Sequence, residues 1–416
     1  MVHRHIIYTK FSAWRFKIKD ACGSYLWDDK GKQYIDFTSG WNVTNLGWNR
    51  PEIAEAVSSQ VMKNTYASMW FCDDLQEKYA SALHHVLPKE LDSCSRVTGG
   101  VEANEHAMKL ARAYTGRKKI LGFYETYHGN NLSMLEVGYR KEWLTSISSD
   151  NSDYIHLEYP NIYRTDLNET EVLHDFEKRL EAVLENEDVA AVFAESGIIS
   201  GWGSAYVAPT GFLTVVRRLT EKYGTLLILD EVGTGFSRTG KLFGMKHENI
   251  VPDIVTFAKG MSNGVAPIGA MVTKEKIAEV ADPANLQSTF GWLPISCAAA
   301  LETLKIHEKE KIWERVQKTG HYMMGELKKH LQDHPNVGDI RGMGMILGLD
   351  FVKDKKTKQK YPELTEKIVL HAWKKGLHLV CDHESVIQLM PPLTIEKEVL
   401  DKGIKVLVNV IKDLRV

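Results

Sequence analysis

The chain has 416 residues, of which 44% are hydrophobic and 25% charged, and its formal net charge is −2. This is the composition of a folded protein with room for one large and one smaller domain. The balanced charge gives no general attraction to nucleic acid, and no apolar run approaches the roughly 20 residues of a membrane span. Five scattered cysteines without a C-x-x-C pair predict no disulfide framework and no metal site, and we expect a cytoplasmic protein without a signal peptide.

The first half of the chain reads as short strands that alternate with helices. Two strands are expected within 24–37, and helices over 51–66 and 74–87. Apolar runs then predict strands at 96–98, 119–123, 190–194, 226–230, 254–257 and 269–272. Helical patterns lie between several of them, at 102–114, 172–184 and 211–223. Strands alternating with helices predict an α/β fold with a mostly parallel sheet.

The last third of the chain has a different pattern. Residues 293–332 form one long helical stretch that could bridge to a second domain. From about residue 337 the pattern restarts as strand, helix, strand and helix, at 344–350, 364–375, 386–390 and 397–412. This order predicts a smaller α+β domain.

Two residues at strand ends carry the chemistry. The run 226–229 ends in Asp230, and Lys259 follows the apolar run 254–258. A carboxylate can keep a pyridine nitrogen protonated, and a lysine can form a Schiff base. This pair is what pyridoxal 5'-phosphate (PLP) requires of a protein.

Another strand end predicts an anion site. Gly99 and Gly100 lie between a strand and a helix, so their backbone N–H groups and that of Val101 can point from the helix N-terminus toward a phosphate. A simple strand-to-helix turn is the alternative reading of this segment.

The stretch from Leu227 to Gly269 closely resembles the signature of class III, or omega, aminotransferases, which belong to fold-type I of the PLP-dependent enzymes. The resemblance extends over about residues 20–412 and includes Tyr127-His128-Gly129 and Pro391-Pro392. It implies a large PLP-binding domain over 51–320, with its sheet between helices, and a small domain built from 1–50 and 321–416.

The resemblance assigns further residues to the cofactor. Tyr127 would stack on the pyridine ring and Val232 would pack on the opposite face. Glu195 would be an acid near the cofactor. His128 taken alone is a structural hydrogen-bonding residue rather than a base. Gly233 replaces a side chain that many relatives place near the phenolic oxygen of PLP.

The resemblance also implies a homodimer, in which Thr289 reaches the phosphate of the neighbouring subunit's cofactor. Trp41 could line the amine pocket, although a core tryptophan is an equal alternative. The loop 198–206 resembles the family little and would shape the substrate entrance.

Residue 388 bears on the substrate. Many relatives that use 2-oxoglutarate carry an arginine here, whose guanidinium clamps a carboxylate. Gln388 has no such charge. We therefore expect an aminotransferase that moves an amino group from an amine or an omega-amino acid to a keto acid, with pyruvate favoured over 2-oxoglutarate.

Two other functions stay open. A racemase, epimerase or aminomutase would share Asp230 and Lys259 on the same fold. The segment 235–241 satisfies G-x-x-x-x-G-K, as in nucleotide hydrolases, but Leu242 stands where a hydroxyl should bind magnesium.

Overall fold

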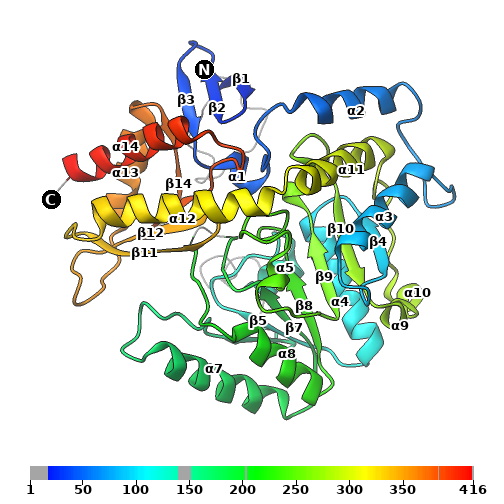
Figure 1. The fold of residues 1–416 in the computed structure, drawn as a ribbon. Coiled ribbons are helices and arrows are strands. Elements are labelled where there is room, and N and C mark those ends of the chain that lie inside the picture. Colours follow the sequence, from blue (N-terminus) through cyan, green and yellow to red (C-terminus); the bar gives the residue numbers. More distant parts are fainter. Residues whose placement is uncertain (1–16, 139–150, 202–203, 383, 415–416) are drawn as a thin grey trace, which may run out of the picture.

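The computed structural model describes residues 17–138, 151–201, 204–382 and 384–414. Figure 1 shows a large sheet wrapped by helices, with a group of C-terminal helices and strands beside it. The strands of the N-terminal segment lie next to the C-terminal elements, and β3 (Gln33–Asp36) pairs with β13 (Leu377–His378).

Seven strands form the large sheet, in the order β4-β10-β9-β8-β7-β5-β6. Only β10 runs antiparallel to its neighbours; the other pairs are parallel, which confirms the predicted mostly parallel sheet. The strands are β4 (Ser93–Val97), β5 (Lys119–Phe123), β6 (Tyr154–Leu157), β7 (Val189–Glu195), β8 (Leu226–Asp230), β9 (Ile254–Phe257) and β10 (Gly269–Thr273).

Helices cover both faces of this sheet because its central strands are apolar on both sides. In β8, Leu226 and Ile228 pack in one core and Leu227 and Leu229 in the other. The first core contains α4 (Gly100–Thr115), α5 (Leu132–Val137), α9 (Glu275–Ala278) and α10 (Ala281–Ala284). The second contains α3 (Asp74–Val86), α7 (Glu169–Leu184), α8 (Phe212–Lys222) and α11 (Pro294–Lys309).

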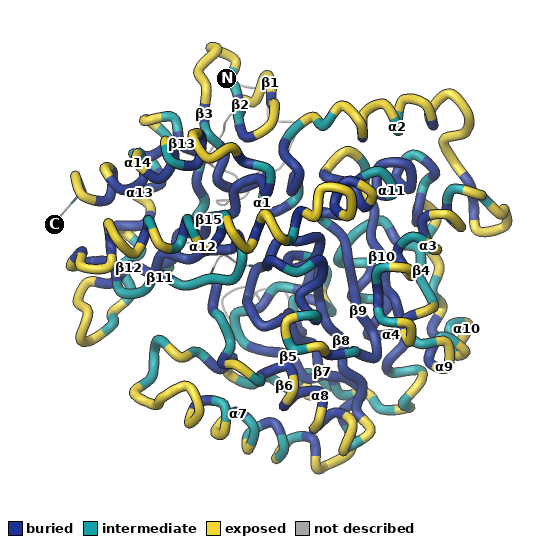
Figure 2. The backbone as a smooth tube through the Cα atoms, in the orientation of Figure 1, coloured by how far each residue is buried: buried dark blue, intermediate teal, exposed yellow. Residues whose placement is uncertain are grey.

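Two smaller sheets lie beside the large one. The first pairs β1 (Ile18–Cys22), β2 (Tyr25–Asp28) and β3 (Gln33–Asp36) with β13 (Leu377–His378). The second joins β11 (Val337–Met343), β12 (Ile346–Phe351), β15 (Val386–Leu389) and β14 (Val380–Cys381). A third core packs against them, and Figure 2 shows its buried inner faces under exposed outer turns. Its helices include α2 (Pro51–Val61), α12 (Ile312–Leu331), α13 (Pro362–Lys374) and α14 (Lys397–Asp413).

The structure corrects several predicted elements. The helical stretch 293–332 is two helices, because the backbone of Lys311 is left-handed (φ 46°) between α11 and α12. The strand expected from residue 344 starts at Ile346, since Gly344 is left-handed in the turn of a hairpin. The partner strand of that hairpin, β11, was not predicted; its charged residues and glycines suit an edge strand that pairs only with β12.

A fully buried arginine joins the parts of the molecule. Arg238 donates hydrogen bonds to Ser39 Oγ (3.2 Å) and Asn45 Oδ1 (2.7 Å) in the N-terminal segment. It also donates to the carbonyl oxygens of Met345 (3.2 Å) and Pro391 (2.6 Å). Segments that are far apart in the chain therefore share one buried cation.

The segment that contains Arg238 is not a P-loop. A P-loop continues into a helix whose N-terminus faces the phosphates. Here residues 235–241 are followed by the short 3₁₀-helix η2 (Gly244–His247). The guanidinium of Arg238 donates its hydrogen bonds to acceptors inside the protein. Among the described helices, none is both long and apolar enough to cross a membrane.

Candidate functional site

A cavity of ≈410 Å³ opens at the carboxyl ends of the parallel strands. Asp230 comes from the end of β8, Glu195 from the end of β7, and Tyr127 and His128 from the loop after β5. Lys259 is the second residue after the end of β9, the strand that pairs with β8, and it lines the same cavity. Ligands of such sheets bind at this edge, so the fold brings the predicted residues to one place.

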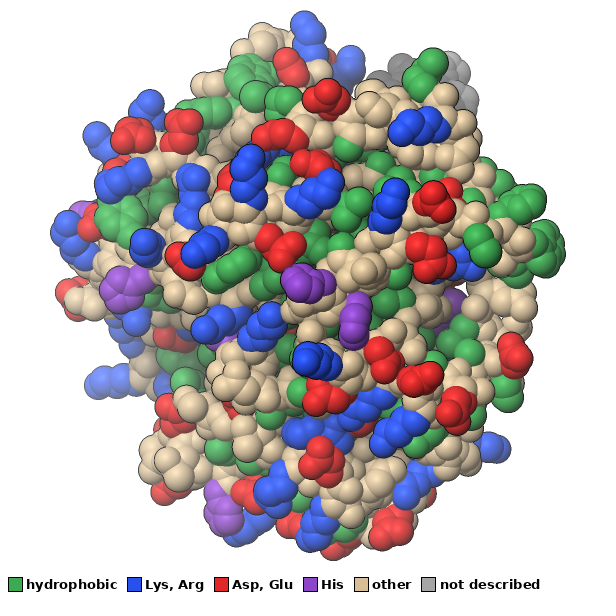
Figure 3. Space-filling model, turned by 45° about the vertical axis from the view of Figure 1, so that its right-hand side comes forward, with side chains coloured by type: hydrophobic (Ala, Val, Ile, Leu, Met, Phe, Trp, Pro, Cys, Tyr) green, Lys and Arg blue, Asp and Glu red, His purple; other side chains and the backbone are tan. Residues whose placement is uncertain are grey.

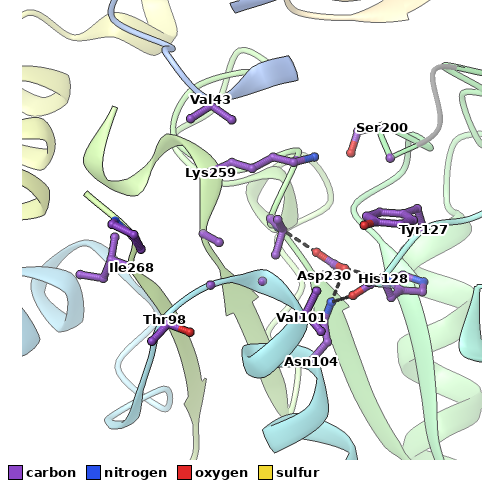
Figure 4. Close-up of a pocket in the computed structure, with 18 of the residues that line it drawn as sticks. Val43, Thr98, Val101, Asn104, Tyr127, His128, Ser200, Asp230, Lys259 and Ile268 are labelled. Atoms are coloured by element: carbon purple, nitrogen blue, oxygen red, sulfur yellow. Dashed lines mark hydrogen bonds and ion pairs between the residues drawn. The ribbon is translucent and has the colours of Figure 1, made fainter. Parts of the chain in front are cut away.

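The carboxylate of Asp230 is held at both oxygens. Its Oδ2 accepts a hydrogen bond from Asn104 Nδ2 (2.8 Å) and lies 2.7 Å from Nδ1 of His128. Its Oδ1 accepts from the backbone N–H of Val232 (2.8 Å). Asn104 is itself fixed, because Thr256 Oγ1 donates to its Oδ1 (2.6 Å). Figure 4 shows Asn104 and His128 beside Asp230.

Lys259 starts the 3₁₀-helix η3 (Lys259–Ser262) with a left-handed backbone (φ 31°), which is unusual for a residue with a side chain. Burial lowers the pKa of its amine, while the charges of Glu195 and Asp230 act in the opposite direction. A lowered pKa increases the fraction of neutral amine, which is the form that attacks a carbonyl or takes up a proton.

Glu195 is buried and bonded at only one oxygen. Its Oε2 accepts from the backbone N–H (2.8 Å) and the hydroxyl (2.5 Å) of Ser200. Its Oε1 has no hydrogen-bond partner in the described chain. Burial, with the charge of Asp230 beside it, raises the pKa of this carboxyl to about 7.

The predicted anion site lies at the start of α4. Gly99, Gly100 and Val101 line the cavity, and Gly99 caps the helix without a side chain. A Cβ at Gly100 would lie 2.9 Å from Cγ1 of Val232, so a side chain there would displace Val232. The carboxylate of the neighbouring Glu102 accepts hydrogen bonds from the N–H and the hydroxyl of Thr98, which also lines the cavity.

Three predicted residues lie outside the cavity lining. Trp41 donates from Nε1 to the carbonyl of Gly201 (3.4 Å), and Gln388 donates from Nε2 to the carbonyl of Ser200 (3.3 Å). Both therefore support the loop at the cavity rather than facing it. Thr289 is exposed on the surface of this chain.

Asn104 lies in the segment 102–105, which resembles a cofactor loop of the family, but no role was predicted for it; Ser200 and Asn42 were not singled out. Asn104 lies one turn into α4, and a polar residue on the buried side of a helix is the signal that could have found it. Asn42 donates from Nδ2 to the carbonyl of Gly233 (2.5 Å), and its neighbour Val43 lines the cavity. Residues 39–42, labelled α1 in Figure 1, all have positive φ angles, which is common for glycine and asparagine but unusual for Ser39 and Trp41.

Comparisons with known proteins agree with this geometry. Residues 9–411 match the model of the family described as aminotransferase class-III. The chain is 31% identical to a leucine/methionine racemase of Thermococcus litoralis, covering 94% of this chain and 89% of that protein. It is 32% identical to an acetylornithine aminotransferase of Methanothermobacter thermautotrophicus, covering 94% and 93%. A solved (S)-enantioselective omega-transaminase from Thermomicrobium roseum superposes with a TM-score of 0.92 at 32% identity, covering 99% and 96%.

Proposed function

Because the chain belongs to the class III aminotransferase family, we propose that it moves an amino group from an amine or omega-amino acid to a keto acid, with pyruvate favoured over 2-oxoglutarate. The observation that carries this proposal is that Lys259 and Asp230 line one cavity from neighbouring strands.

The class III aminotransferases are PLP-dependent, and the cavity residues fit that cofactor. Two buried polar atoms in the lining residues, Nε2 of His128 and Oε1 of Glu195, lack partners within the described chain and could bond to a ligand. The N-terminus of α4 offers N–H groups for a phosphate, although the Gly99-Gly100-Val101 turn has no hydroxyl. Lys259 would hold the cofactor through Nζ, and Tyr127 and Val232 would pack on its ring.

When bound, PLP supplies an aldehyde that links to amines and a ring that accepts the electrons of a deprotonated carbon. Asp230 would hold a positive charge at the ring nitrogen, and the hydrogen bonds that it accepts from Asn104 and Val232 fix its carboxyl group in place. Nζ of Lys259, once free, would carry the proton that leaves the substrate carbon.

The charges of the cavity support an amine donor. Among the described lining residues Lys259 is the sole lysine or arginine, whereas Glu195 and Asp230 are acids. Gln388 lies behind Ser200 and brings no charge. A substrate with a second carboxylate, such as glutamate, would find no guanidinium at this position.

An absorbance titration tests the proposal. The holoenzyme should lose its visible band on addition of a simple amine or alanine and regain it with pyruvate, and borohydride reduction should label Lys259. Conversion by glutamate alone would contradict the proposed substrates, and labelling of a different lysine would contradict the proposed site.

A racemase is the second candidate, because one of the relatives is a leucine/methionine racemase. A racemase would invert an amino acid without a keto acid. Incubation with single enantiomers of leucine and alanine, with and without pyruvate, separates the two functions: turnover that needs no keto acid would favour racemisation.

We also propose a homodimer. The exposed large apolar side chains include Trp70 at 84%, Phe71 at 64% and Phe290 at 60%, and the ring of Phe290 lies 6.2 Å from that of Tyr66. Phe290 directly follows Thr289, the residue expected to serve a neighbouring site. Figure 3 shows charged side chains of both signs mixed over one face, with hydrophobic side chains grouped at its right-hand edge. Exposed apolar clusters of this kind mark protein interfaces.

Substitution at the cluster tests the dimer. The double variant Trp70→Ser, Phe71→Ser should sediment as a monomer, while Leu167→Ser, which removes an apolar side chain 46% exposed elsewhere, should not change the sedimentation coefficient. A wild-type monomer would refute the homodimer.

A further inference from the structure

The side chain of Ser200 fills the space that a side chain at Gly233 would need. Gly233 has no side chain, and a Cβ built there would lie 2.0 Å from Oγ and 3.0 Å from Cβ of Ser200. The carbonyl of Gly233 is fixed by Asn42, so the backbone has little freedom to retreat. The side chain of Ser200 therefore fills the volume that any larger residue at 233 would need.

From this position Ser200 fixes one carboxyl oxygen of Glu195. Both hydrogen bonds from Ser200 go to the same oxygen, Oε2, and leave Oε1 without a partner in the described chain. Ser200 is itself held from behind by the amide of Gln388, which donates to its carbonyl oxygen. Both Ser200 and Glu195 line the cavity.

The charged and titratable groups around Glu195 come from several elements. Asp230 approaches from β8, His128 from the loop after β5, Lys259 from η3, and the buried Tyr159 from the segment after β6. Burial and Asp230 favour the protonated acid, whereas His128 and the two hydrogen bonds from Ser200 favour the carboxylate. These opposing effects place the proton equilibrium of this side chain near neutral pH.

We propose that Ser200 is a positioning residue for the cofactor: it takes the place of a side chain at 233 and fixes Glu195 so that one carboxyl oxygen stays free to bond with bound PLP. This inference rests on the proposed function. Ser200 would set both the orientation and the protonation of the Glu195 carboxyl group. Because the two residues share one volume, a larger side chain at 233 would require a smaller one at 200.

The first test compares two serines. Ser200→Ala removes a hydroxyl donor that favours the carboxylate, so the pH midpoint of Glu195 protonation, followed by the infrared carboxyl band of the holoenzyme, should rise by about one pH unit. Ser196→Ala is the matched control, because Ser196 donates a similar buried hydrogen bond to Glu231 (2.9 Å) without lining the cavity. The shift should disappear when Ser200→Ala is made in a Glu195→Gln background. No shift in Ser200→Ala, or equal shifts in both serine variants, would overturn the proposal.

The second test exploits the shared volume. Gly233→Ala alone should weaken PLP binding to the apoenzyme about tenfold or more, measured by quenching of tryptophan fluorescence, because the new methyl group collides with Ser200. The double variant Ser200→Gly, Gly233→Ala should recover most of that affinity and keep a raised pH midpoint. Failure of the double variant to recover affinity would count against the shared space.

The outcomes separate this inference from the proposed function. If the wild-type chain neither binds PLP at Lys259 nor exchanges amino groups, the proposed function fails. If it does both and the Ser200 variants behave like the Ser196 control, only the role of Ser200 fails.

Discussion

Asp230 and Glu195 are two buried carboxyl groups of one cavity, and their surroundings differ. Asp230 accepts hydrogen bonds at both oxygens, from Asn104 and from the backbone of Val232. Glu195 accepts at one oxygen only, from Ser200. Two acids in such different environments can have different roles. Asp230 can provide a fixed charge, and Glu195 can exchange a proton.

The raised pKa of Glu195 makes the stability of the cofactor-free protein depend on pH. The pKa is about 7 in the folded chain against an ordinary value of 4.5, so the folded state holds this proton more tightly than the unfolded state. The associated stability is present below pH 4.5 and is lost as the pH rises to about 7, a change on the order of 3 kcal/mol. Glu195→Gln should remove this loss. Urea unfolding of the apo-proteins at pH 5 and pH 8 should show the variant gaining on the wild type at the higher pH; a constant difference would contradict the expectation.

At the scale of elements, close backbone contact between a strand and a turn shapes the end of the cavity beside the N-terminus of α4. Gly269 starts β10 directly behind Gly99, the N-cap of α4. A Cβ at 269 would lie 2.7 Å from the carbonyl oxygen and 2.9 Å from Cα of Gly99. The position of the α4 N-terminus therefore depends on the absence of a side chain in β10.

Gly269→Ala should push the Gly99 turn out of place. We expect a loss of about 1–3 kcal/mol in the free energy of unfolding, together with weaker PLP binding. Gly325→Ala is the control, since a Cβ there meets no atom within 4 Å and Gly325 lies inside α12. That variant should keep PLP affinity and gain up to about 1 kcal/mol from better helix propensity. Equal PLP affinity in both variants would argue against the contact.

The predictable elements are those with strong apolar runs. β7, β8 and β9 are buried along their whole length, and such runs mark central parallel strands in the sequence. β11 was missed because its burial is partial, and β6 because all four of its residues are only half-buried at the sheet edge. For the site, Lys259 and Asp230 were predicted to meet, whereas the support of Glu195 by Ser200 depends on a loop conformation that no sequence period encodes.

For the whole molecule, the family match over residues 9–411 and the similar solved structures confirm the predicted class III aminotransferase fold and its dependence on PLP. The domain limits at residues 50 and 320 and the cytoplasmic location stay predictions. The contacts of Arg238 could not be predicted, since they join residues from four distant parts of the chain.

Arg238→Met tests how firmly those parts are joined. The change leaves the buried acceptors of Asn45 and Pro391 without their donor, so we expect a loss of about 3 kcal/mol or more in the free energy of unfolding. Arg218→Met is the control, because Arg218 is half exposed and its pairing with Glu177 lies at the surface. Thermal unfolding of the two variants should differ clearly; similar melting temperatures would show that Arg238 contributes little.

Mixed dimers test whether Thr289 serves the other subunit. Thr289→Ala homodimers should bind PLP about tenfold more weakly, if one charge-assisted hydrogen bond to phosphate is lost. Lys259→Ala homodimers lack the attachment point. A mixed dimer of the two variants would contain one complete site, with Lys259 from one subunit and Thr289 from the other. Its titration should therefore recover wild-type affinity at half of the sites; no recovery would place Thr289 outside the partner's site.

The segment around Val43, which lines the cavity, is bonded to residues near the other end of the chain. The N–H of Met390 donates to the carbonyl of Phe37 (2.8 Å), the N–H of Leu393 to that of Asn45 (2.8 Å), and β3 pairs with β13. During synthesis on the ribosome the N-terminal segment has none of these partners until residues 377–393 have emerged. The large sheet can form earlier, so the cavity would close only after the sheet has folded, and a nascent chain arrested before residue 377 should carry a folded sheet that does not yet retain PLP.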